Sequence, residues 1–167
     1  MIAKKILVLI TAILLASALA AGPLDQLRKE HAPLFQALEA DGVVFAWDQA
    51  VVLNMNVKDK PMTSINLTGA LEKRKDVMVT LTAMGEKGAA KPLLVGVMLD
   101  ADKLTETGAK ITMVGWSFLE NKVMAVTMTT GTMEASPSAM SPEEAEAMFK
   151  VYLPHTFAYL QKQNSEE

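Results

Sequence analysis

The chain has 167 residues, a net charge of −3 at neutral pH and no cysteine. The absence of cysteine excludes disulfide bonds, a thiolate nucleophile and a thiolate metal site. The acidic balance disfavours nucleic-acid binding, which needs a basic face to neutralise phosphates.

Residues 1–20 have the three parts of a secretory signal peptide. Lys4 and Lys5 form a basic start, the run from Ile6 to Leu19 is apolar, and Ala18-Leu19-Ala20 is a small-x-small cleavage site. The apolar run is shorter than the roughly 20 residues that a membrane-spanning helix needs. A retained anchor is the alternative interpretation.

Cleavage after Ala20 would leave residues 21–167. We expect this mature chain to be one α+β domain, because about 150 residues suffice to bury a core without disulfides. The signal predicts a bacterial periplasmic or secreted protein that contacts the membrane only through the signal peptide before cleavage.

The segment from Pro23 to Asp41 predicts a helix, because apolar residues recur at spacings of three and four. Pro33 lies inside this pattern and should kink or split the helix. Gly42 is suited to the left-handed conformation that ends a helix.

Seven strand-like segments follow, and the short turns between them favour a six- or seven-stranded antiparallel meander. Threonine alternates with apolar residues along them, which predicts an apolar face and a threonine-covered face. The segments are Val43–Trp47, Ala50–Val57, Met62–Leu71, Val77–Met84, Leu93–Leu99, Ile111–Leu119 and Val123–Thr132.

Residues 134–141 have mostly small side chains and predict a linker to a C-terminal helix. Ser141, Pro142 and Glu144 then match a capping box with proline at the first helical position. Pro154 should kink this helix. Its many aromatic and aliphatic side chains indicate that it packs on the sheet together with the N-terminal helix.

The residues Trp47-Asp48-Gln49 interrupt an apolar stretch and allow two interpretations. The first is a turn between two strands, which aspartate favours. The second is a partly enclosed carboxylate beside a tryptophan, which would have a raised pKa.

The twelve methionines suggest a site for Cu(I) or Ag(I), because thioether sulfur is a soft ligand. The closest pair, Met124 and Met128, would lie about 13 Å apart along a strand. A site would therefore have to assemble across strands, for instance from Met113 and Met124. Core filling is the favoured role of the methionines, and no metal site is predicted.

No catalytic constellation is visible, so we expect a protein without enzymatic activity and without a cofactor. Gly115-Trp116-Ser117 begins like a nucleophile elbow but lacks the second glycine. The two histidines, His31 and His155, exclude a three-histidine zinc site. They could meet if the two helices pack side by side.

The sequence therefore favours a binding or carrier domain for a small apolar molecule, with a pocket between the sheet and the C-terminal helix. One alternative is a scaffold that meets a periplasmic protein through a sheet edge or the N-terminal helix. Another is the methionine site for Cu(I) or Ag(I). The expected ligand-binding residues are Trp47, Asp48, Trp116, Phe149, Tyr152 and Tyr159.

Overall fold

The computed structural model describes residues 22, 24–57, 59–86, 93–101, 110–129 and 134–165. The expected signal peptide lies outside these residues. Residues 24–30 are helical. The elements that follow are α2 (Ala32–Ala40), β1 (Val43–Phe45), the 3-10 helix η1 (Trp47–Gln49), β2 (Val51–Val57), β3 (Lys60–Leu71), β4 (Arg74–Glu86), β5 (Leu93–Ala101), β6 (Lys110–Ser117), β7 (Lys122–Thr129), β8 (Glu134–Pro137), α3 (Pro142–Tyr152) and α4 (Pro154–Ser165).

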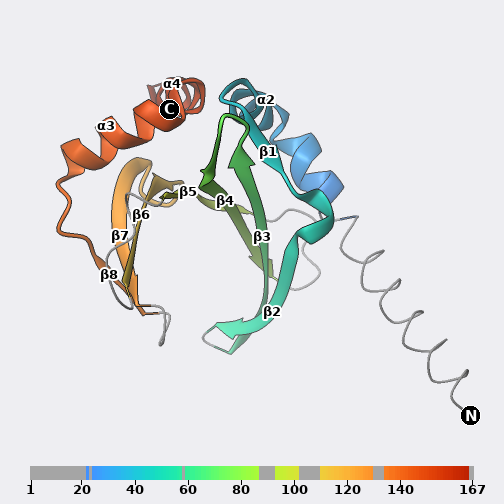
Figure 1. Ribbon diagram of the computed structural model, residues 1–167. Helices are drawn as coiled ribbons and strands as arrows, with labels where there is room; N and C mark the ends of the chain where they lie inside the picture. The colour runs from blue at the N-terminus through green and yellow to red at the C-terminus, as the bar shows by residue number, and fades with distance from the viewer. Residues whose placement is uncertain are drawn as a thin grey trace, which may run out of the picture.

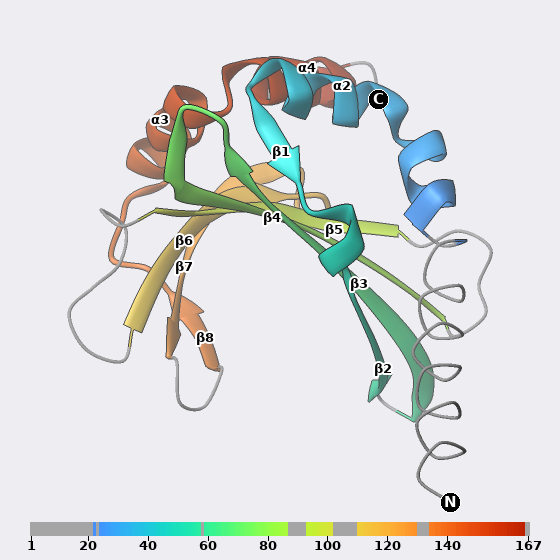
Figure 2. The same cartoon turned by 45° about the vertical axis from the view of Figure 1, so that its right-hand side comes forward.

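The strands form one antiparallel sheet with the order β1-β3-β4-β5-β6-β7-β8, and β2 also pairs with β3. The strands β1 and β2 share one edge of β3, β1 along residues 69–71 and β2 along residues 60–66. Figures 1 and 2 show a strongly curved sheet with α2, α3 and α4 on one side of it. The expected α+β meander with an N-terminal helix and a kinked C-terminal helix is confirmed.

The eighth strand is the main departure from the expected elements. The sequence predicts a linker over residues 134–141, but the first half of this stretch is β8, which pairs with β7 through Thr127 and Ser136. Small residues and a proline have low strand propensity, so local sequence gives no sign of this strand. Pro137 is tolerated because β8 is an edge strand in the described sheet.

The helix boundaries follow the local signals. The N-terminal helical segment is interrupted by a turn at His31, and α2 then begins with proline in its first turn. Gly42 follows α2 with a φ of 83°, in the left-handed region. The Ser141 side chain caps α3 in a full capping box with Glu144, and Pro154 begins α4 one residue after the α3 C-cap.

The core lies between the sheet and the helices. Alternate residues of the central strands, such as Leu67 of β3 and Leu81 of β4, are fully buried against this side. Leu38 of α2 and Phe149 of α3 are fully buried from the other side. We call this the covered face, and the opposite side of the sheet the open face, because no helix of the described residues lies over it (Figure 2).

The threonines divide between the two faces, so the expected threonine-covered face exists only in part. Thr80 and Thr82 alternate with buried residues of β4 and lie on the open face. Thr112 and Thr127 are paired across β6 and β7 and are buried on the covered face. Strand alternation fixes which residues share a face, but it does not reveal which face the helices cover.

Candidate functional site

A pocket opens between the end of the sheet, α2 and α4. Its volume is about 320 Å³, at the lower end of the range for small-molecule sites. Two of the expected ligand-binding residues, Trp116 of β6 and Tyr159 of α4, line it together. The other lining residues are His31, Leu34, Leu94, Phe118, Asn121, Leu160, Gln163 and Asn164.

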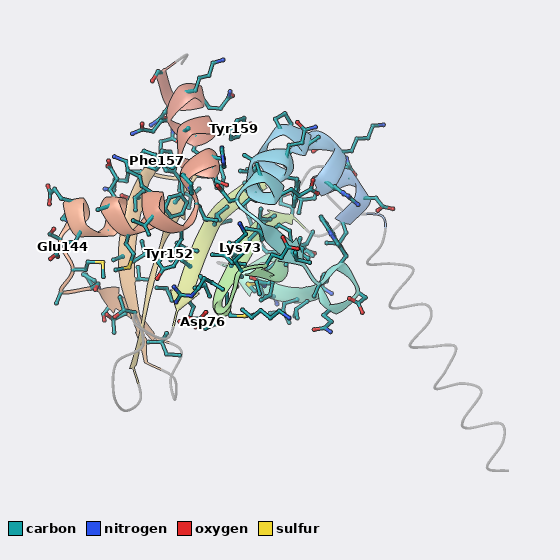
Figure 3. The ribbon with its side chains drawn as sticks, turned by 45° about the horizontal axis from the view of Figure 1, so that its top comes forward. Lys73, Asp76, Glu144, Tyr152, Phe157 and Tyr159 are labelled. Carbon is teal, nitrogen blue, oxygen red and sulfur yellow. The ribbon has the colours of Figure 1, made fainter. Side chains whose placement is uncertain are left out.

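Helix α4 provides one wall of the pocket through a single face. Tyr159 and Gln163 are four residues apart, as are Leu160 and Asn164, so all four side chains project toward the pocket. Figure 3 shows Tyr159 on the helix beyond Phe157. The apolar spacing in the sequence predicts the buried Leu160, but the polar pair belongs to no motif, and sequence reasoning missed it.

The rim of the pocket is held by one hydrogen bond. The side-chain amide of Asn164 donates to the backbone carbonyl oxygen of Asn121 at 2.9 Å. Asn121 lies in the loop between β6 and β7 and has a φ of 51°, a left-handed conformation that asparagine tolerates. This bond ties the end of α4 to the β6–β7 loop, and a second, more polar cavity lined by the same two asparagines and Trp116 lies beside it.

The pocket lining carries no formal charge at neutral pH. Burial lowers the pKa of His31 from its ordinary 6.5, which keeps the imidazole neutral, although the nearby charge of Glu30 opposes the shift. Burial raises the pKa of Tyr159 above its ordinary 10.0, which keeps the phenol neutral. A neutral lining that mixes aromatic and amide groups suits an uncharged, mainly apolar molecule with a polar end.

Phe149 and Tyr152, two of the other expected residues, are core residues and do not reach the pocket. Phe149 is fully buried and stacks edge-to-face on Phe157, which in turn contacts Trp116 with a ring-centroid distance of 6.3 Å. Tyr152 lies beside the β3–β4 turn (Figure 3), where it interacts with Arg74. Phe149 therefore supports the pocket wall from behind, through Phe157.

Trp47 and Asp48 lie apart from the pocket. Trp47 packs on Phe35 and Phe45, and the guanidinium of Arg28 lies 4.9 Å from its ring centroid. Asp48 is exposed in η1, so these residues form a turn and not an enclosed carboxylate site. The turn interpretation of Trp47-Asp48-Gln49 is the one the structure supports.

The two histidines lie at opposite ends of the packed pair α2 and α4. His31 precedes α2 and faces Tyr159 and Gln163 across the pocket. The backbone N–H of His155 instead contacts Asp41, which follows α2. The helices are therefore antiparallel, and the histidines do not meet.

The open face of the sheet carries most of the large hydrophobic residues that are exposed in the described part of the chain. Among the eight large hydrophobic residues described as exposed, six lie on this face by strand register, including Val51 at 49% and Leu53 at 47% exposure. The other four are Val44, Met55, Met78 and Leu93. Val51, Leu53 and Met55 are neighbours on one face of β2, and exposed apolar side chains grouped in this way are typical of an interaction site.

Within the described ranges, no three histidine, aspartate or glutamate side chains gather in a way that could hold a metal ion. The helices of the same ranges include none that is both long and apolar enough to cross a membrane. Comparisons with known protein families, with curated proteins and with solved structures find no match for this chain.

Proposed function

We propose that this protein is an exported binding or carrier domain for a small, uncharged, mainly apolar molecule. The observation that carries the proposal is the neutral pocket of about 320 Å³ between α2, α4 and the β6–β7 loop. Trp116 and Phe118 offer apolar area, and Gln163 and Asn164 offer hydrogen bonds at the mouth. No enzymatic step is proposed.

The polar residues at the mouth set the expected shape of the ligand. An apolar body would contact Leu34, Leu160 and the indole of Trp116, and a hydroxyl, carbonyl or amide group would point toward Gln163. A charged ligand is disfavoured, because the lining offers no formal charge of opposite sign to offset its desolvation.

Binding can be tested with N-phenyl-1-naphthylamine, an uncharged aromatic probe whose fluorescence rises in apolar sites. Gln163→Trp places an indole in the mouth of the pocket and should weaken probe binding by about tenfold or more, or about 1.4 kcal/mol. Gln36→Trp is the matched control, because Gln36 is exposed on α2 outside the pocket. Equal affinity in both variants contradicts the proposal.

Native mass spectrometry of the protein isolated without detergent identifies the natural ligand. The expected result is a mass excess of one small molecule that is absent in Gln163→Trp and present in Gln36→Trp. An excess that persists in Gln163→Trp would place the ligand elsewhere on the protein and overturn the assignment of the pocket.

Export is proposed from the composition of residues 1–20. Amino-terminal sequencing of the protein from a periplasmic fraction should begin at Ala21. A chain that retains Met1 and stays in the cytoplasmic fraction would contradict the proposed export.

A second candidate function, docking of a protein partner, is favoured by the open face. Val51, Leu53 and Met55 lie on one face of β2, and all three are exposed. A photo-crosslinking residue at Leu53 should capture one discrete partner in the cell, whereas the same residue at Leu119, exposed in the β6–β7 loop, should not. Equal labelling at both sites argues against this candidate.

A further inference from the structure

Three methionines surround one glycine on the open face. Met98 of β5 and Met124 of β7 are both paired with Gly115 of β6, one from each side. Met113 lies on β6 two residues before Gly115 and therefore points to the same side of the sheet. Each of these methionines alternates with residues buried against the helices, which places all three thioethers on the open face.

The side chain of Met98 lies across Gly115. A Cβ atom built on Gly115 would overlap the sulfur of Met98, and one built on Gly96 would lie 3.9 Å from the same sulfur. Both glycines are buried although no helix of the described chain covers them. The Met98 sulfur therefore occupies the space that the missing side chains of the two glycines leave on the sheet.

The spacing of the strands brings the other two sulfurs within reach of this space. Residues directly opposite each other on antiparallel strands have Cα atoms about 4.5–5.5 Å apart, and diagonal neighbours are about 7–8 Å apart. Met124 is opposite Gly115, and Met113 is diagonal to both Met98 and Met124. With three rotatable bonds each, the side chains can aim their sulfurs at one point above Gly115.

The chemistry of three thioethers selects the metal. Thioether sulfur is a soft, neutral ligand that suits Cu(I) and Ag(I) and binds Mg²⁺, Ca²⁺ and Zn²⁺ poorly. The three methionines are half-buried, so each residue is partly shielded from water and partly accessible to solvent. Met78 of β4, diagonal to Met98 and 40% exposed, is placed to add a fourth sulfur.

We propose that Met98, Met113 and Met124 form a binding site for Cu(I) or Ag(I) above Gly115. The site is on the opposite face of the sheet from the pocket and does not depend on the proposed apolar ligand. Thioethers carry no proton at accessible pH, so binding releases none and is insensitive to pH in the neutral range.

Silver is the probe of choice because Ag(I) needs no reductant. With the methionine methyl carbons labelled by ¹³C, titration of the whole protein with silver nitrate in chloride-free buffer should shift the signals of Met98, Met113 and Met124, with saturation at one equivalent. Met148, half-buried on α3, is the internal control and should not shift. Unshifted signals of the three, or uniform shifts of all the methionines, overturn the site.

Substitutions give a second, independent measurement. Each of Met98→Leu, Met113→Leu and Met124→Leu should lower the silver affinity by at least about tenfold, since removal of even an outer-shell partner typically has that effect. Met148→Leu is the matched control and should bind like the wild type. Leucine conserves volume and is well tolerated at half-buried positions, and circular dichroism verifies folding. Unchanged affinity in the three variants contradicts the proposal.

Discussion

The carboxylate of Asp41 caps the first turn of the helix that contains Thr156. Its Oδ2 accepts a hydrogen bond from the backbone N–H of Thr156 at 2.8 Å, and its Oδ1 accepts one from His155 at 2.9 Å. The negative charge also lies at the positive end of the α4 dipole. One residue thus satisfies two backbone donors and joins the end of α2 to the start of α4, two segments more than 100 residues apart in the sequence.

Replacement of Asp41 should destabilise the protein through this cap. Asp41→Ala is expected to lower the free energy of unfolding by about 2 kcal/mol, the upper end for loss of a helix cap, because two N–H groups lose their acceptor. Asp41→Asn keeps one acceptor oxygen and should lose about half as much. Urea unfolding measures both, with the exposed Asp48→Ala as control. Equal losses at both aspartates would show that the cap contributes nothing.

Loss of the capping box of α3 should destabilise the protein less than loss of the Asp41 cap. The Ser141 hydroxyl accepts from the N–H of Glu144 at 3.2 Å, and the Glu144 carboxylate accepts from the N–H of Ser141 at 2.9 Å. Ser141→Ala should lower the free energy of unfolding by about 1 kcal/mol. Ser141→Asp restores an acceptor at the N-cap and should recover most of it in the same urea experiment; no recovery would contradict the capping role.

Three glycines differ in the space around them, so replacement of each by alanine should destabilise the protein to a different degree. A Cβ on Gly115 would overlap the backbone carbonyl oxygen of Val97, a Cβ on Gly96 would lie 3.1 Å from that of Trp116, and a Cβ on Gly22 meets nothing within 4 Å. Gly115→Ala should destabilise by about 1–3 kcal/mol, Gly96→Ala by less, and Gly22→Ala not at all. Thermal unfolding gives the order, and a reversal of the first two would contradict the register of β5 and β6.

Removal of the Thr156 hydroxyl should raise the stability of the protein. Thr156 is fully buried, and its Oγ1 has no hydrogen-bond partner among the described residues. Thr156→Val keeps the shape and the β-branch and removes this unsatisfied polar atom, so the free energy of unfolding should rise by about 1 kcal/mol. Thr156→Ser, which keeps the hydroxyl and loses a methyl, should lower it. A loss of stability in the valine variant would indicate that the hydroxyl has a partner in solution.

The lowered pKa of His31 predicts a loss of stability in mild acid. The unfolded chain takes up a proton near pH 6.5, whereas the folded chain does so only at lower pH. The stabilisation from the neutral imidazole is therefore complete above pH 6.5 and decreases as the pH falls toward the folded pKa. His31→Gln removes this contribution, so its urea midpoint should fall less between about pH 7.5 and about pH 5.5 than that of the wild type. Parallel decreases would contradict the burial of His31.

The pocket combines residues that local sequence patterns indicate with residues that only distant contacts bring together. The sequence predicts Trp116 on a strand and Tyr159 on a helix as ligand-binding residues, and both line the same pocket. Phe149 and Tyr152 are also aromatic residues of a helix, but they belong to the buried core and do not line the pocket. The orientation of α3 on the sheet decides this, and the aromatic character of the residues does not reveal it. Asn121 and Asn164 join the rim only through a contact between distant segments.

Local features of this protein follow from short stretches of its sequence. Capping at Ser141, the breaks at Pro33 and Pro154 and the ends of most strands depend on residues a few positions apart, so their signals are present in any short window. The face of each strand that the helices cover is instead set by tertiary packing. This packing buried Thr112 and Thr127, left the methionines around Gly115 on the open face and paired β8 with β7. Those outcomes depend on the packing of segments far apart in the chain. The alternation of residues along one strand is the same whichever of its two faces the helices cover.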